Sequence, residues 1–103
     1  MALRLPQTLS TSVASVEAFD AGLQVELMAE KAASLGRAGK RVETTLAALR
    51  DASDVDRPAA LKDAADAVWS LFVQREICGQ RDQKPVIAIY GIPKDVLARL
   101  GAR

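Results

Sequence analysis

Alanine content and the spacing of the larger apolar side chains constrain the fold of this chain more than any other feature. Nineteen of its 103 residues are alanine, and half of all residues are apolar although only 4% are aromatic. Alanine has the highest helix propensity and lets helices approach closely. The larger apolar residues recur at steps of three and four, the period of a helix face. The sequence therefore predicts an all-α protein: a bundle of three longer helices followed by a short C-terminal helical hairpin.

The first half of the chain contains the longest helical pattern. We predict a flexible N-terminal lead over residues 1–11 and a single helical domain over 12–103, with a first helix over 13–35. Gly36 and Gly39 are expected to end that helix, because glycine commonly terminates helices. Two apolar stripes on one helix imply at least two packing partners; they consist of Val16, Phe19, Leu23 and Leu27, and of Val25, Met28, Ala32 and Leu35.

The second half is predicted as two further helices and the hairpin. A helix over 40–52 leads into a turn, and a helix over 58–78 follows with Pro58 in its first turn and Gly79 after its end. Residues 85–90 favour a short helix, although their β-branched run leaves a strand as the alternative. Gly91 ends this segment, and Val96, Leu97 and Leu100 mark a last short helix.

The residues that the chain lacks restrict its chemistry. It contains no histidine, the usual proton shuttle near neutral pH and the commonest metal ligand. Cys78 is the only cysteine, so an internal disulfide is impossible, and one free thiol fits a reducing cytoplasm. No apolar stretch approaches the roughly 18 residues that a membrane span needs. The net charge of +1 does not by itself imply nucleic acid. We expect no enzyme activity, no cofactor and no membrane association.

Four carboxylates form the only candidate metal site. Glu26 and Glu30 lie four apart on one helix face, and Asp63 and Asp66 lie three apart on another helix. Carboxylate oxygens suit Mg²⁺ or Mn²⁺. The set loosely resembles the all-helical nucleotide pyrophosphohydrolases, whose motif pairs E-x-x-E with E-x-x-D. Here the first pair has a different spacing and the second lacks its glutamate, so a carboxylate-metal hydrolase is only a third hypothesis.

A structural role for these charges is better supported. Arg75 and Glu76 extend an apolar stripe towards the expected interior, and buried charges need partners. We therefore expect a buried ion-pair network of Glu26, Glu30, Arg75 and Glu76. On the same helix, Trp69 and Phe72 are expected in the core, with a subunit interface as the alternative, because aromatic residues are favoured at interfaces.

The C-terminal hairpin has the packing pattern of a helix-turn-helix. Its basic residues, which are the candidate nucleic-acid contacts, are Lys84, Lys94, Arg99 and Arg103. Base readout requires polar side chains on the second helix. Asn, Gln, Ser and Thr are absent from that helix, and Asp95 would repel phosphate. DNA binding through residues 83–103 is therefore the alternative hypothesis.

Three stretches also resemble a known family: KAASLGRAGKRVETTLAAL, AADAVWSLFVQREICGQRD and YGIPKDVLARLG. They resemble an uncharacterised family of small all-helical proteins from Alphaproteobacteria, a domain of unknown function. The resemblance covers most of residues 17–101. It implies a bacterial, cytosolic, all-helical protein but no activity, ligand or catalytic residue.

The leading functional hypothesis is a non-enzymatic interaction or structural protein that acts through its helix surfaces. We expect a homodimer, because the alanine-rich core is small and the first helix has two apolar stripes. An unidentified protein partner is the other way to cover such surfaces.

Overall fold

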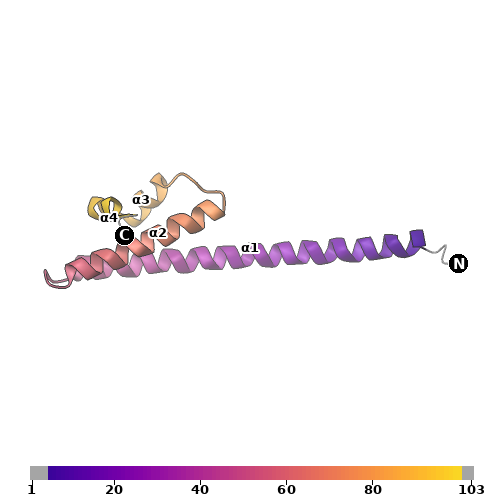
Figure 1. Cartoon of the computed structure of the whole chain (residues 1–103), viewed down its shortest axis with the longest axis horizontal. Helices are drawn as coiled ribbons and strands as arrows, with labels where there is room; N and C mark the ends of the chain where they lie inside the picture. Colours follow the sequence, from indigo (N-terminus) through magenta and orange to yellow (C-terminus); the bar gives the residue numbers. More distant parts are fainter. Residues whose placement is uncertain (1–4, 101–103) are drawn as a thin grey trace. The chain divides into compact units, whose positions relative to one another are not determined.

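The computed structural model describes the backbone of residues 5–100 and the side chains of residues 17–100. Within these ranges it contains four α-helices and no strand: α1 (Leu5–Asp51), α2 (Arg57–Ile77), α3 (Lys84–Tyr90) and α4 (Lys94–Arg99) (Figure 1). The all-α class and the C-terminal helical hairpin are confirmed, and residues 85–90 are helical. Helix α1 begins inside the segment predicted as a flexible lead, of which residues 1–4 lie outside the described part.

Helix α1 continues through both glycines that were expected to end it, so the helices predicted over 13–35 and 40–52 are one. A glycine inside a helix costs only about 1 kcal/mol relative to alanine, which packing can offset. Gly39 is buried, and a Cβ atom added there would overlap the Tyr90 hydroxyl oxygen and lie 3.4 Å from the adjacent ring carbon. Gly39 is therefore a site of close packing against α3, and not a helix stop.

The chain divides into two compact units, residues 1–32 and 33–103, and each is described by itself. We predicted a single helical domain over 12–103. The division falls after Ala32 because every side chain of residues 17–32 is exposed. The buried side chains that the structure describes all belong to the second unit, and they are Val42, Leu46, Leu49, Ala64, Ala65, Ala67, Val68, Leu71, Val86, Ile92 and Val96.

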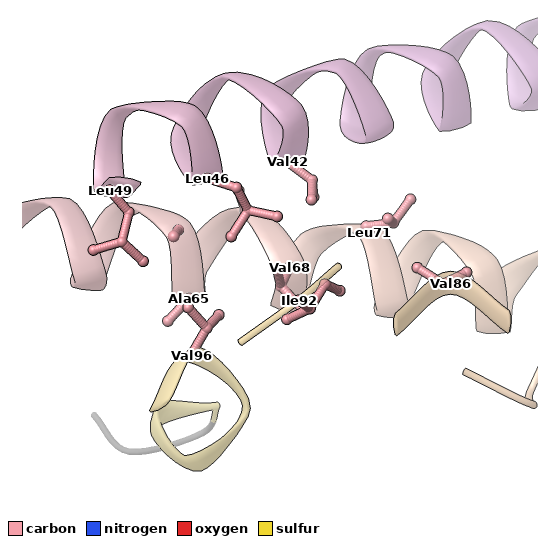
Figure 2. Packing of buried hydrophobic residues seen from close by; sticks show 11 residues of the cluster. Val42, Leu46, Leu49, Ala65, Val68, Leu71, Val86, Ile92 and Val96 are labelled. Atoms are coloured by element: carbon pink, nitrogen blue, oxygen red, sulfur yellow. The ribbon is translucent and has the colours of Figure 1, made fainter. Parts of the chain in front are cut away.

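The core of the second unit is built around α2. In Figure 2, Val42, Leu46 and Leu49 of α1 point towards α2, and Ile92 and Val96 approach α2 from its other side. The alanines of α2 allow this close approach because they add little bulk between the helices. Residues at steps of three and four therefore face both neighbours, which explains why α2 is apolar around much of its circumference.

The helix ends in this unit follow local sequence signals. Pro58 lies in the first turn of α2, as predicted. Gly79 (φ 86°) follows the end of α2 and Gly91 (φ 62°) follows α3, and both use the left-handed conformation that glycine adopts without strain. After Gly91, the amide of Ile92 donates to the Ile87 carbonyl at 3.1 Å. This hydrogen bond turns the chain so that Ile92 enters the core.

Candidate interaction surfaces

An exposed apolar row lies on the first unit. Phe19, Leu23 and Leu27, which we call the α1 stripe, follow each other at four-residue steps and therefore share one helix face. Their exposed fractions are 70%, 42% and 52%. Val25 and Met28 are exposed as well. Large contiguous apolar patches on a protein surface are a common feature of interaction sites.

The charge of this segment is strongly acidic. Residues 17–32 contain four acidic side chains and one basic side chain, Lys31. Glu26 lies three residues after Leu23, so that its exposed carboxylate borders the α1 stripe. A partner that covers the stripe would therefore be matched best by a surface carrying positive charge.

The second unit contains an open groove of small side chains, here called the α1–α2 groove. Its volume is about 490 Å³, and it is lined by Thr44, Thr45, Ala48, Ala52, Asp56, Ala59, Ala60 and Asp63. The Thr44 hydroxyl donates to the Lys40 carbonyl at 3.0 Å, and the Thr45 hydroxyl donates to the Arg41 carbonyl at 2.8 Å. Because both hydroxyls are already bonded within the helix, the groove can accept an apolar side chain.

Basic residues border this groove. Residues 33–51 contain four basic side chains, including Arg37 and Arg41, against Glu43 and Asp51. Arg41 is exposed and precedes Thr44 and Ala48 by three and seven residues, so that it lies on the helix face that forms the groove. The charged side chains that line the groove itself are acidic, Asp56 and Asp63.

The two aromatic residues of α2 differ in their environment. Phe72 is half-buried and packs against the core, as expected. Trp69 is 44% exposed and lies outside the core, because it points to the flank of α2 where Val73 and Ile77 are also exposed. The use of Trp69 and Phe72 as a subunit interface stays a prediction.

The prediction of a buried ion-pair network is wrong, because none of its four residues is buried. Glu26, Glu30 and Glu76 are exposed, and no charged side chain among the described residues is buried. Arg75 is half-buried. Its guanidinium donates to Gln83 Oε1 at 2.9 Å, Gln80 Oε1 at 2.8 Å and the Asp82 carbonyl at 3.0 Å.

These hydrogen bonds explain why Arg75 needs no buried carboxylate as a partner. Arg75 lies in the last turn of α2, where the chain folds back and brings amide oxygens of the α2–α3 loop within reach. The arginine therefore holds a loop in place. The nearby glutamines were the signal that the sequence analysis missed.

The proposed carboxylate site has no counterpart in the described part of the chain, which contains no group of three or more metal-ligating side chains. Asp66 accepts a hydrogen bond from Lys62 Nζ at 3.0 Å, an ordinary pair one helical turn apart. Asp63 lines the α1–α2 groove.

The basic residues of the hairpin lie on its surface. Lys84, Lys94 and Arg99 are exposed, and Arg103 lies outside the described residues. Arg57 Nη2 donates to Asp95 Oδ2 at 2.6 Å, and this hydrogen bond lowers the pKa of the Asp95 carboxyl below its ordinary value. The pair links the start of α2 to α4. The sequence analysis treated Asp95 only as a charge that would repel phosphate.

Comparisons with known proteins identify a family but no activity. The model of a family described as "Family of unknown function (DUF6665)" matches residues 1–103, so the chain belongs to this family. No curated protein and no solved structure matches the chain. None of the helices, as far as the structure describes them, is long and apolar enough to cross a membrane.

Proposed function

We propose that this member of the family is a non-enzymatic helical interaction protein that functions as a homodimer through the surface of α1. One observation carries the proposal: every side chain of residues 17–32 is exposed although the segment carries the α1 stripe. Short helices without tertiary contacts are marginal in water, and most helical stability in proteins comes from packing an apolar face. The helical state of this segment therefore calls for a partner surface.

Substitution of Leu23 tests the proposal. Leu23→Asp places a charge in the middle of the α1 stripe, and Gln24→Asp places the same charge on the neighbouring exposed position, which points about 100° away. We expect the wild type and Gln24→Asp to sediment as dimers, and Leu23→Asp to sediment as a monomer with reduced helical circular dichroism. A wild-type chain that stays monomeric at 100 μM would overturn the proposal.

Nucleic-acid binding by the hairpin is the second candidate, and the Arg57–Asp95 pair favours it. The acidic group of α4 is engaged by an arginine, which reduces the expected repulsion of phosphate. Helix α4 has only six residues, which is short for a helix that reads a groove. Anisotropy of a labelled duplex would decide this point. Salt-sensitive binding that is lost in a Lys94→Glu/Arg99→Glu variant would support the alternative.

The proposed setting is the bacterial cytoplasm. The single half-buried Cys78 is a free thiol, which suits a reducing compartment. The resemblance of three stretches to alphaproteobacterial proteins supports a bacterial source. Fractionation of cells that produce a tagged chain would test the compartment.

A further inference from the structure

We propose that the α1–α2 groove binds a basic amphipathic helix of a partner protein. That helix presents small apolar side chains to the groove and carries two lysine or arginine side chains, seven residues apart, along one edge. This inference goes beyond the proposed homodimer, because the groove is lined by residues of the second unit, whereas the α1 stripe belongs to the first. It rests on the floor of the groove, its charge and the spacing of that charge.

The floor of the groove suits close approach by a third helix. The groove has a volume of about 490 Å³, and alanine and threonine supply six of its eight lining residues. Because these side chains are short, a helix can pack between α1 and α2 as helices do when the ridges of one enter the grooves of another. The hydroxyls of Thr44 and Thr45 donate to carbonyls of their own helix, so a partner that covers them leaves neither hydroxyl unsatisfied.

The charge of the groove determines which helix fits. Its charged lining residues, Asp56 and Asp63, are both acidic and both exposed. The Asp56 carboxylate accepts a hydrogen bond from the Ser53 hydroxyl at 3.2 Å. Within the described part of the chain, no basic side chain forms an ion pair with Asp63. A positively charged helix therefore gains two opposed charge pairs, whereas an acidic helix is repelled.

The spacing of the two carboxylates specifies the partner further. Asp56 and Asp63 are seven residues apart, about two helical turns, so they lie on one side of α2 and about 10.5 Å apart. Basic side chains seven residues apart on a partner helix have the same separation. The exposed Arg41 borders the groove on α1 and would repel a helix that is basic on both edges. The positive edge of the partner therefore lies along α2.

A labelled peptide tests the groove. The probe is a helical peptide of alanine and leucine with two lysines seven residues apart, and its matched control has glutamates at the same two positions. Fluorescence anisotropy with the full-length chain should show binding of the lysine peptide that weakens as salt is raised, because exposed charge pairs are screened. The glutamate peptide should bind about tenfold more weakly or less. Equal binding of the two peptides, or no binding of the lysine peptide at about 1 mM, would overturn the proposal.

Removal of the carboxylates locates the bound peptide. Asp63→Asn should weaken binding of the lysine peptide about threefold, and Asp56→Asn/Asp63→Asn about tenfold, as expected for exposed charge pairs. Asp54→Asn makes the same change at an exposed position of the same connection that does not line the groove. It should leave the dissociation constant unchanged. Equal effects of the Asp54 and Asp63 variants would contradict the groove as the site.

A second variant fills the groove without changing its charge. Ala48→Leu places a larger side chain on the floor, and the exposed position should tolerate it with the circular dichroism and unfolding midpoint of the wild type. Binding of the lysine peptide should fall about tenfold, because the peptide can no longer approach both helices. Ala98→Leu, at an exposed position of α4 that does not line the groove, is the matched control. Undiminished binding to the Ala48 variant would overturn the proposal.

The outcomes also separate this proposal from the homodimer. Leu23→Asp should bind the lysine peptide as the wild type does, because the α1 stripe does not line the groove. Loss of binding in Glu26→Gln, with full retention in Asp63→Asn, would place the peptide on the acidic segment of α1 and overturn the groove as its site. A wild-type chain that is monomeric but binds the lysine peptide through Asp63 would support the groove and overturn only the homodimer.

Discussion

At the scale of single residues, two glycines of α1 have different roles although neither ends the helix. A Cβ atom at Gly36 would meet no other atom within 4 Å, whereas one at Gly39 would meet the Tyr90 hydroxyl. Gly36 therefore costs helix stability without a packing benefit. Gly39 allows the tyrosine of α3 to lie against α1.

Alanine substitutions distinguish the two glycines. Gly36→Ala should raise the free energy of unfolding by about 0.5–1 kcal/mol, since alanine is the better helix former. Gly39→Ala should lower it by about 1 kcal/mol or more, because the Tyr90 ring must move. Urea denaturation would measure both values. Equal stabilisation by the two substitutions would contradict the packing role of Gly39.

Removal of the Tyr90 hydroxyl provides the control. In a Tyr90→Phe background the overlapping oxygen is absent, and the nearest remaining ring carbon lies 3.4 Å from the added Cβ. The cost of Gly39→Ala should therefore shrink in this background, while the effect of Gly36→Ala should not change.

Asp95 makes a pH-dependent contribution at the same scale. The hydrogen bond from Arg57 lowers its pKa from the ordinary value of 3.8, so the ionised form is favoured in the folded chain. The stabilisation that the ionised Asp95 carboxylate provides is complete above the ordinary pKa of 3.8 and is lost as the pH falls through the lowered pKa of the folded chain. Wild type should be more stable than Asp95→Asn at pH 7, and urea midpoints should converge below about pH 3.8. A difference that stays constant down to pH 2 would exclude this origin.

At the scale of elements, Arg75 holds the loop that connects α2 to α3. Its three hydrogen bonds hold the loop through Gln80, Asp82 and Gln83. The loop in turn fixes the start of α3, where the Lys84 amide donates to Asp82 Oδ1 at 3.1 Å. Arg75 therefore contributes to the position of the hairpin, together with the buried side chains of Val86, Ile92 and Val96.

Replacement of Arg75 by methionine keeps the apolar stem and removes the donors. We expect a loss of about 1–2 kcal/mol, since charged hydrogen bonds contribute more than neutral ones but this side chain is partly hydrated. Amide hydrogen exchange in residues 79–84 should become faster. Arg81→Met, at an exposed position of the same loop, is the matched control. Unchanged exchange in the Arg75 variant would show that the loop is held by other contacts.

At the scale of the whole molecule, the proposed dimer depends on burial of the apolar α1 stripe, and salt distinguishes apolar burial from charge pairing. Interactions between exposed charges are largely screened at high ionic strength, whereas apolar burial is not. The dimer should therefore persist between 50 mM and 500 mM NaCl. Complete dissociation at 500 mM would show that the α1 stripe contributes little.

Local signals in the sequence determined the all-α class and most helix ends. Alanine content, the steps of three and four, and the positions of Pro58, Gly79 and Gly91 act through backbone preferences of neighbouring residues. For this reason α2, α3 and α4 could be predicted closely from the sequence. The α1 stripe could be recognised in the sequence as a periodic apolar pattern, but the sequence did not predict that its side chains are exposed.

Tertiary contacts determined the features that local sequence signals did not predict. Gly39 is needed for close packing against Tyr90, fifty-one residues later in the chain. Asp95 is paired by Arg57, and the α1–α2 groove exists only because two helices bring their small residues together. Each depends on which distant residues meet, and periodicity within one helix carries no information about that. The sequence by itself therefore determined the elements and their faces, whereas the packing of those faces determined which surfaces remain open to a partner.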